Sequence, residues 1–120
     1  MTDNVNHPAH YTQYKREVIE LTSLLDFTLG NAVKYILRAP YKGKMEEDLA
    51  KACWYLRHPH TIERSVVPAE ALKIVSDYEH PYLDKLLNIF PSVCDGEKRP
   101  WVKCAVDEFI ADYIAKTAKN

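Results

Sequence analysis

The sequence has little glycine and few cysteines. Its 3 glycines are too few for an all-β protein with many tight turns. The 3 cysteines, Cys53, Cys94 and Cys104, form no Cys-x-x-Cys pair, which is typical of a reducing compartment. No apolar run approaches the roughly 20 residues of a membrane helix, and residues 1–20 lack the apolar core of a signal peptide. We therefore expect a cytoplasmic protein with no membrane partner.

A large excess of charge of one sign is also missing. The chain has 16 Lys and Arg against 17 Asp and Glu, a formal net charge of -1. Nonspecific nucleic-acid binding and polybasic membrane anchoring both need a strong field of one sign, so we expect neither. The phosphate-binding pattern Gly-x-x-x-x-Gly-Lys-Ser/Thr and the dinucleotide pattern Gly-x-Gly-x-x-Gly are absent. The Gly-x-Ser-x-Gly elbow and the His-Glu-x-x-His zinc helix are absent too. A ligand would have to be held by a local cluster of side chains.

The residues that are present predict a small helical domain. With 120 residues and 47% hydrophobic side chains, the chain can form one domain with its own core. Gly30 and Pro40 interrupt the helical spacing of the apolar residues, and Pro100 is placed to begin a helix. We predict one all-α domain over residues 1–120, with an extended N-terminal arm over residues 1–15 and five or six helices. The expected helices cover residues 16–27, 32–39, 45–57, 69–79, 82–90 and a last segment from residue 100.

The densest polar cluster lies between residues 30 and 44, which carry four basic side chains and no acidic one. Lys34 and Arg38 are four residues apart and share one face of the expected helix. Asn31 lies one turn earlier, where it is expected to cap that helix, and Tyr35 lies beside the two cations. Two cations on consecutive turns are suited to holding a phosphate group.

An alternative explanation for the same cations is structural. Lys34 and Arg38 could pair with the acids that open the next helix, which are Glu46, Glu47 and Asp48. Those acids could bind Mg²⁺, or they could complement the dipole at the N-terminus of their helix.

His7 and His10 form a second candidate site in the N-terminal arm. Spaced three residues apart, they could reach one metal ion, or one of them could donate a hydrogen bond to a phosphate or a base. No third ligand accompanies them, so we expect no metal ligands in this protein.

Three blocks of the sequence, in this order, resemble the motifs of a small, mostly bacteriophage-encoded family. Residues 5–11 (VNHPAHY) are similar to its VNHPxHY opening, and residues 30–39 (GNAVKYILRA) to its GNAxKYxxRA core. Residues 42–43 (KG) and 47–56 (EDLAKACWYL) are similar to its KG…EDLxKAxWYL segment. The family is known largely as a domain of unknown function, and some members are described as phage nucleotide kinases.

The resemblance covers residues 5–57 and implies which side chains act on a nucleotide. It marks residues 16–57 as the family-like core and leaves residues 58–120 as a helical extension without a counterpart. The implied ligand-binding residues are His7, His10, Tyr11, Asn31, Lys34, Tyr35, Arg38 and Lys42. The implied catalytic residues are Asp48, as an orienting group or proton acceptor, and Lys51.

Two functions are compatible with these residues: the family description favours the first, and the missing phosphate loop favours the second. The leading hypothesis is a phage nucleoside monophosphate kinase in the cytoplasm of an infected cell, using Mg²⁺ with a nucleoside triphosphate. The alternative is a non-catalytic sponge that sequesters a cyclic or ADP-ribose-type nucleotide signal of bacterial antiviral defence. Because so small a domain has little room for two nucleotide sites, we also predict a symmetric homo-oligomer with sites near its subunit interfaces.

Overall fold

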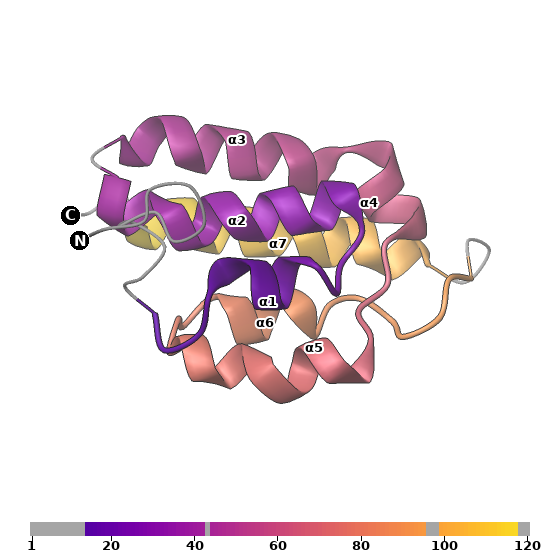
Figure 1. Ribbon diagram of the computed structural model, residues 1–120. Helices are drawn as coiled ribbons and strands as arrows, with labels where there is room; N and C mark the ends of the chain where they lie inside the picture. Colours follow the sequence, from indigo (N-terminus) through magenta and orange to yellow (C-terminus); the bar gives the residue numbers. More distant parts are fainter. Residues whose placement is uncertain (1–13, 43, 96–98, 118–120) are drawn as a thin grey trace.

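The computed structural model describes residues 14–42, 44–95 and 99–117, and in these residues the chain is helical without any strand (Figure 1). The predicted all-α class is confirmed. The elements are α1 (Val18–Thr22), α2 (Phe27–Lys42), α3 (Met45–Arg57), α4 (Pro59–Arg64), α5 (Ala69–Ile74), the 3-10 helix η2 (Val75–Tyr78), α6 (Leu83–Leu87) and α7 (Pro100–Thr117). The predicted arm lies outside the described residues except for its last two.

The beginning of α2 differs from the sequence prediction. The helix starts at Phe27, and Gly30 lies inside its first turns instead of interrupting it. A Cβ at Gly30 would lie 3.3 Å from the backbone oxygen of Thr22, so glycine is used here for the close approach of α1. Asn31 is therefore not a cap: its Nδ2 donates to the backbone oxygen of Phe27, 2.8 Å away.

The end of α2 also lies later than predicted, because Pro40 falls in the last turn and the helix continues to Lys42. By contrast, the predicted bounds of α3 and the predicted start of α7 at Pro100 are confirmed. The segment at His58 was expected only to stop a helix. It also begins the next one, since Pro59 opens α4 and the ring Nδ1 of His58 accepts a hydrogen bond from the backbone nitrogen of His60.

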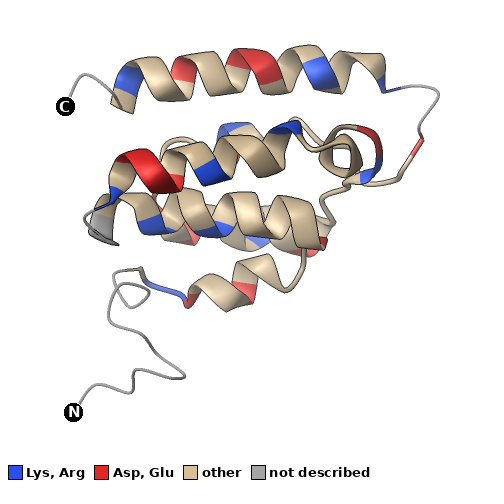
Figure 2. Cartoon of the chain, turned by 90° about the horizontal axis from the view of Figure 1, so that it is seen from above, with Lys and Arg blue, Asp and Glu red and all other residues tan. Residues whose placement is uncertain are grey.

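The core forms around α2, which lies between α3 and α1 in Figure 1, with α7 behind it. One face of α7 is buried and covers the inner helices, with Val106, Ile110 and Tyr113 at most 2% exposed. In Figure 2, α7 has basic segments near its two ends and acidic segments between them. Within the described ranges, no helix has the length and apolar character needed to cross a membrane.

Long-range polar contacts hold α1 against η2. The Arg16 guanidinium Nε lies 2.6 Å from Asp77 Oδ2, and the hydroxyl of Tyr78 donates to the backbone oxygen of Glu17 at 2.6 Å. The hydrogen bond from Arg16 lowers the pKa of the Asp77 carboxyl. These contacts join residues about sixty positions apart, so the two halves of the chain form one packed structure.

Candidate functional site

Three cationic side chains from two helices gather around the ring of Tyr35. Lys34 Nζ lies 4.6 Å from the ring centroid, Arg38 Cζ 5.8 Å and Lys51 Nζ 5.3 Å. We call Lys34, Tyr35, Arg38 and Lys51 the Tyr35 cluster. The sequence placed Lys34 and Arg38 on one face of a helix with Tyr35 beside them; their meeting with Lys51 depends on the packing of α3 against α2.

The acids on α3 partly neutralise this cluster. Asp48 is 2% exposed, and its Oδ2 lies 3.7 Å from Nε of Arg38, whose side chain is 18% exposed. Both of these atoms are buried and lack a hydrogen-bond partner among the described residues. Lys51 lies 3.9 Å from Glu47, but both side chains are about half exposed, so solvent weakens that pair. The structural alternative drawn from the sequence therefore holds for Arg38.

Lys34 differs from its two neighbours. In the described part of the chain it has no carboxylate within 4.0 Å, and its cationic head lies over the face of Tyr35. A cation–π contact attracts a lysine without cancelling its charge. Lys34 therefore remains available to an anion.

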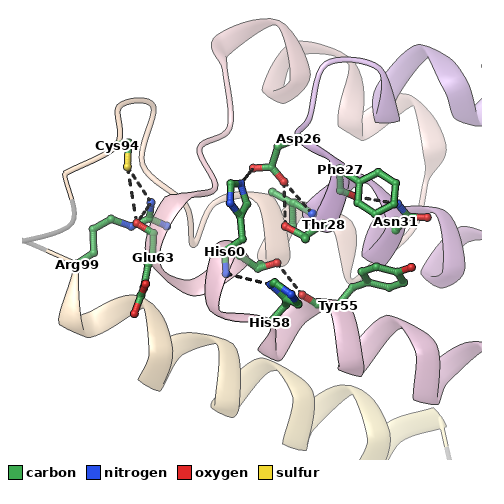
Figure 3. Close-up of polar contacts among 12 residues, drawn as sticks. Asp26, Phe27, Thr28, Asn31, Tyr55, His58, His60, Glu63, Cys94 and Arg99 are labelled. Carbon is green, nitrogen blue, oxygen red and sulfur yellow. Dashed lines mark hydrogen bonds and ion pairs between the residues drawn. The ribbon is translucent and has the colours of Figure 1, made fainter.

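Aromatic rings continue from the cluster along the surface of α2 and α3. Tyr55 is stacked on Tyr35 with ring centroids 6.1 Å apart and planes 14° apart. Phe27 meets Tyr55 edge-on at 6.2 Å, although the Phe27 side chain is 74% exposed. Figure 3 shows Phe27 and Tyr55 together with Asn31, whose amide is held against α2. Phe27 is not among the residues predicted from the sequence; the signal for it was an aromatic residue one turn before Asn31.

A small cavity of about 180 Å³ joins the exposed Phe27 to the Tyr35 cluster. Lys34 belongs to both, and the carboxylate of Asp26 and the amide of Asn31 also line the cavity. The remaining lining residues are Thr22, Leu25 and Gly30. The site thus has a cationic end at Lys34 and an aromatic, polar end at Phe27.

The carboxylate of Asp26 is already used within the fold. Its Oδ1 accepts hydrogen bonds from the backbone nitrogen of Leu29 at 3.0 Å and from Oγ1 of Thr28 at 3.1 Å. Its Oδ2 lies 3.7 Å from Nε2 of His60 on α4 (Figure 3). Asp26 therefore caps α2 and links it to α4.

Several predicted site residues lie outside the described residues: His7, His10 and Tyr11 entirely, and Lys42 for its side chain. The two predicted catalytic residues are described. Asp48 faces Arg38, whereas Lys51 faces Tyr35 and Glu47. Among the described residues there is no cluster of three or more His, Cys, Asp or Glu side chains placed to hold a metal ion.

A larger cavity of about 860 Å³ lies on another face of α3, toward α7. Its lining is mostly apolar and includes Trp54, which is 62% exposed, and Ile114, which is 42% exposed. We call it the α3–α7 groove. Sequence analysis identified no site on this face.

Comparison with known proteins bears on the first half of the chain. Residues 5–57 match the model of a family described as a protein of unknown function, DUF3310. Comparison with curated proteins and with solved structures found no match. The matched segment contains α1, α2 and α3, and with them the whole Tyr35 cluster. The N-terminal part of this chain is therefore similar to a small family of unknown function.

Proposed function

We propose that this protein binds a nucleotide at the Tyr35 cluster and in the small cavity beside it. The observation that carries the proposal is the gathering of Lys34, Arg38 and Lys51 within 6 Å of one tyrosine ring. Asp48 and Glu47 offset the charges of Arg38 and Lys51, so the cluster keeps a positive charge at Lys34 that an anion can neutralise. The phosphate groups of a nucleotide supply that anion.

The phosphate end of the ligand is assigned to Lys34. Arg38 is occupied by Asp48 and Lys51 is shared with Glu47, which leaves Lys34 as the most available cation of the cluster. A charge-assisted hydrogen bond from a lysine to a phosphate is about twice as strong as a neutral one. Arg38 and Lys51 then add positive potential around the bound phosphate.

The base end is assigned to Phe27. An exposed aromatic ring beside a cavity provides a stacking surface, and stacking of one base on one ring contributes about 1–3 kcal/mol. The cavity of about 180 Å³ suits a single base rather than two. Asn31 and Asp26 supply polar atoms beside it. The proposed ligand is therefore a mononucleotide or one end of a larger nucleotide signal.

Retention without turnover is the mode of action that the site supports best. A general base must reach the proton it removes, and Asp48 is 2% exposed and faces Arg38. Phosphoryl transfer by a nucleoside monophosphate kinase, which the resemblance implies, remains the second candidate. A protein that holds a nucleotide signal lowers its free concentration. We propose that this serves a bacteriophage against antiviral defence, in the cytoplasm of the infected cell.

The proposal is tested by incubating the purified protein with mono-, di- and triphosphate nucleotides, cyclic nucleotides and ADP-ribose-type signals, with and without Mg²⁺. Binding is measured by calorimetry, and the mixtures are chromatographed before and after heating. We expect at least one nucleotide to bind and to be released unchanged by heat. Transfer of a phosphate from a triphosphate to a monophosphate present in the same mixture, with both recovered as diphosphates, would establish the kinase instead.

Lys34→Ala and Phe27→Ala test the two ends of the site. Removing one charged contact should weaken binding about tenfold or more, since hydrogen bonds to charged groups contribute about 1.5–3 kcal/mol. Lys73→Ala on α5 is the matched control, because Lys73 is an exposed lysine remote in sequence from the cluster. The absence of binding to every nucleotide tested, or equal binding by all three variants, would contradict the proposal.

A further inference from the structure

The outward face of α3 carries a stripe of exposed side chains that the proposed nucleotide site does not use. The stripe runs along the whole helix and borders the α3–α7 groove; it comprises Met45, Glu46, Ala50, Trp54 and Arg57. Trp54 is 62% exposed and Met45 is 37% exposed. A tryptophan this exposed on a regular helix leaves a large apolar area in water.

The groove beside the stripe is large and mostly apolar. It has a volume of about 860 Å³ and reaches from α3 to Ile114 and Thr117 at the end of α7. Cys53 lies in it and is 5% exposed. Burial raises the pKa of the Cys53 thiol, so this side chain is uncharged at neutral pH and adds to the apolar surface.

The charges on the stripe have a definite order. Glu46 lies in the first turn of α3 and Arg57 in the last, eleven positions away, with apolar or small residues between them. The negative Glu46 at the N-terminus and the positive Arg57 at the C-terminus both interact favourably with the helix dipole. In the described part of the chain, neither side chain has an oppositely charged partner within 4.0 Å. This order makes the stripe self-complementary, because a second stripe running antiparallel sets an acid against each base.

We propose that two copies of this chain pair through the α3–α7 groove, with their α3 helices antiparallel about a two-fold axis. Glu46 of each copy then faces Arg57 of the other. Ala50 faces Cys53, which keeps small side chains where the helices are closest, and Trp54 packs beside Leu49 of the other copy. The indole of each copy occupies apolar groove surface of the other.

A second copy fits this surface better than an unrelated ligand does. An isologous interface uses one patch twice and therefore needs that patch to complement itself, as the stripe does in charge and in size. Tryptophan and arginine are also the residues that most often dominate protein–protein contacts. Lys51 lies on the side of α3 toward Tyr35, so pairing leaves the cations of the Tyr35 cluster open.

Sedimentation or light scattering of the full chain, at roughly 1 to 100 µM, tests the pairing. We expect a dimer, and at least a tenfold weaker association for Trp54→Ala. Glu46→Arg and Arg57→Glu should each weaken it similarly, because each sets like charges against one another at both ends. Mixing the two charge variants should restore pairing, since in the mixed dimer both contacts are again between opposite charges.

Glu47→Arg is the matched control: it makes the same charge change one residue away from the stripe, and it should leave the dimer intact. Circular dichroism verifies that each variant is helical. If Trp54→Ala does not fold, the mixing experiment still tests the pairing, because it uses only the two charge variants. A monomer at 100 µM would overturn the proposal. The groove would then be occupied by something other than a second copy, such as a chain end or a small molecule. A dimer indifferent to Trp54→Ala, or one not restored by mixing, would also overturn it.

Discussion

At the scale of single residues, burial decides what the ionisable groups do. Asp48 belongs to a run of three acids at the start of α3, yet it alone is buried, 2% exposed and facing Arg38. Glu46 and Glu47 on the same turn remain in solvent. The run therefore does not act as one acidic group, and Asp48 serves the packing of α3 against α2.

His80 provides a test of burial through pH. His80 follows η2 in the chain and is partly buried, and this burial lowers its pKa to about 4 from its ordinary value of 6.5. The ring is neutral in the fold, and its Nδ1 accepts a hydrogen bond from the backbone nitrogen of Tyr82 at 3.3 Å. Between pH 6.5 and 4 the unfolded chain binds a proton that the folded chain does not, so stability falls as the pH falls.

We expect this group to remove about 3 kcal/mol of unfolding free energy between pH 7 and pH 4, at about 1.4 kcal/mol per pKa unit. The measurement is urea unfolding of the wild type and of His80→Gln across that range. Toward pH 4 the wild type should lose unfolding free energy relative to His80→Gln, because glutamine does not titrate. Curves that stay parallel would show that His80 is not buried as a neutral ring.

At the scale of elements, the bounds of α2 depend on one residue just before the helix and on two residues within it. Asp26 caps the first turn, Gly30 permits the close approach to Thr22, and Pro40 is tolerated in the last turn. The helix therefore extends beyond both ends of the predicted range. Its earlier start places Phe27 on the first turn, next to the small cavity.

The cap of α2 can be tested with two substitutions at one position. Asp26→Ala removes the acceptor for the backbone nitrogen of Leu29 and the link to His60, and it should lower the unfolding free energy by about 1–2 kcal/mol. Asp26→Asn keeps a side-chain oxygen at the cap and should stay within about 0.5 kcal/mol of the wild type, since Asn and Asp cap about equally well. Equal losses for both variants in urea unfolding would assign the effect to His60 instead.

At the scale of the whole molecule, the second half of the chain completes a core that the family-like segment cannot close by itself. Residues 5–57 contain α1, α2 and α3, and the buried face of α7 packs against α3. Ile110 on that face is 1% exposed, whereas Ile114, one turn later, is 42% exposed and borders the groove. One helix thus serves the core on one side and the proposed interface on the other.

The contribution of α7 to the core is tested by the same substitution at two positions. Ile110→Ala should lower the unfolding free energy by about 2–4 kcal/mol, because it leaves a cavity in a closed core. Ile114→Ala should cost less than about 1 kcal/mol at a low protein concentration, where association does not contribute. Similar losses of unfolding free energy at Ile110 and Ile114 would mean that the face of α7 that carries Ile110 does not pack against the core.

Local sequence determined the helical class and several helix bounds. The acids Glu46, Glu47 and Asp48 suit the start of α3, and Pro59 and Pro100 open α4 and α7, because the first turn of a helix does not need the backbone donor that proline lacks. The grouping of Lys34, Tyr35 and Arg38 also followed from helical spacing alone. For α2, a local rule failed because a tertiary contact with Thr22 favoured the glycine inside the helix.

Only the tertiary structure decided which side chains meet. The arrival of Lys51 at Tyr35, the burial of Asp48 against Arg38, and the exposure of Phe27 and Trp54 all depend on how α3 and α7 pack on α2. Spacing along one helix defines a face, but it does not define what that face contacts. Contacts between helices follow from the burial of apolar surface over the whole chain, which no single motif contains.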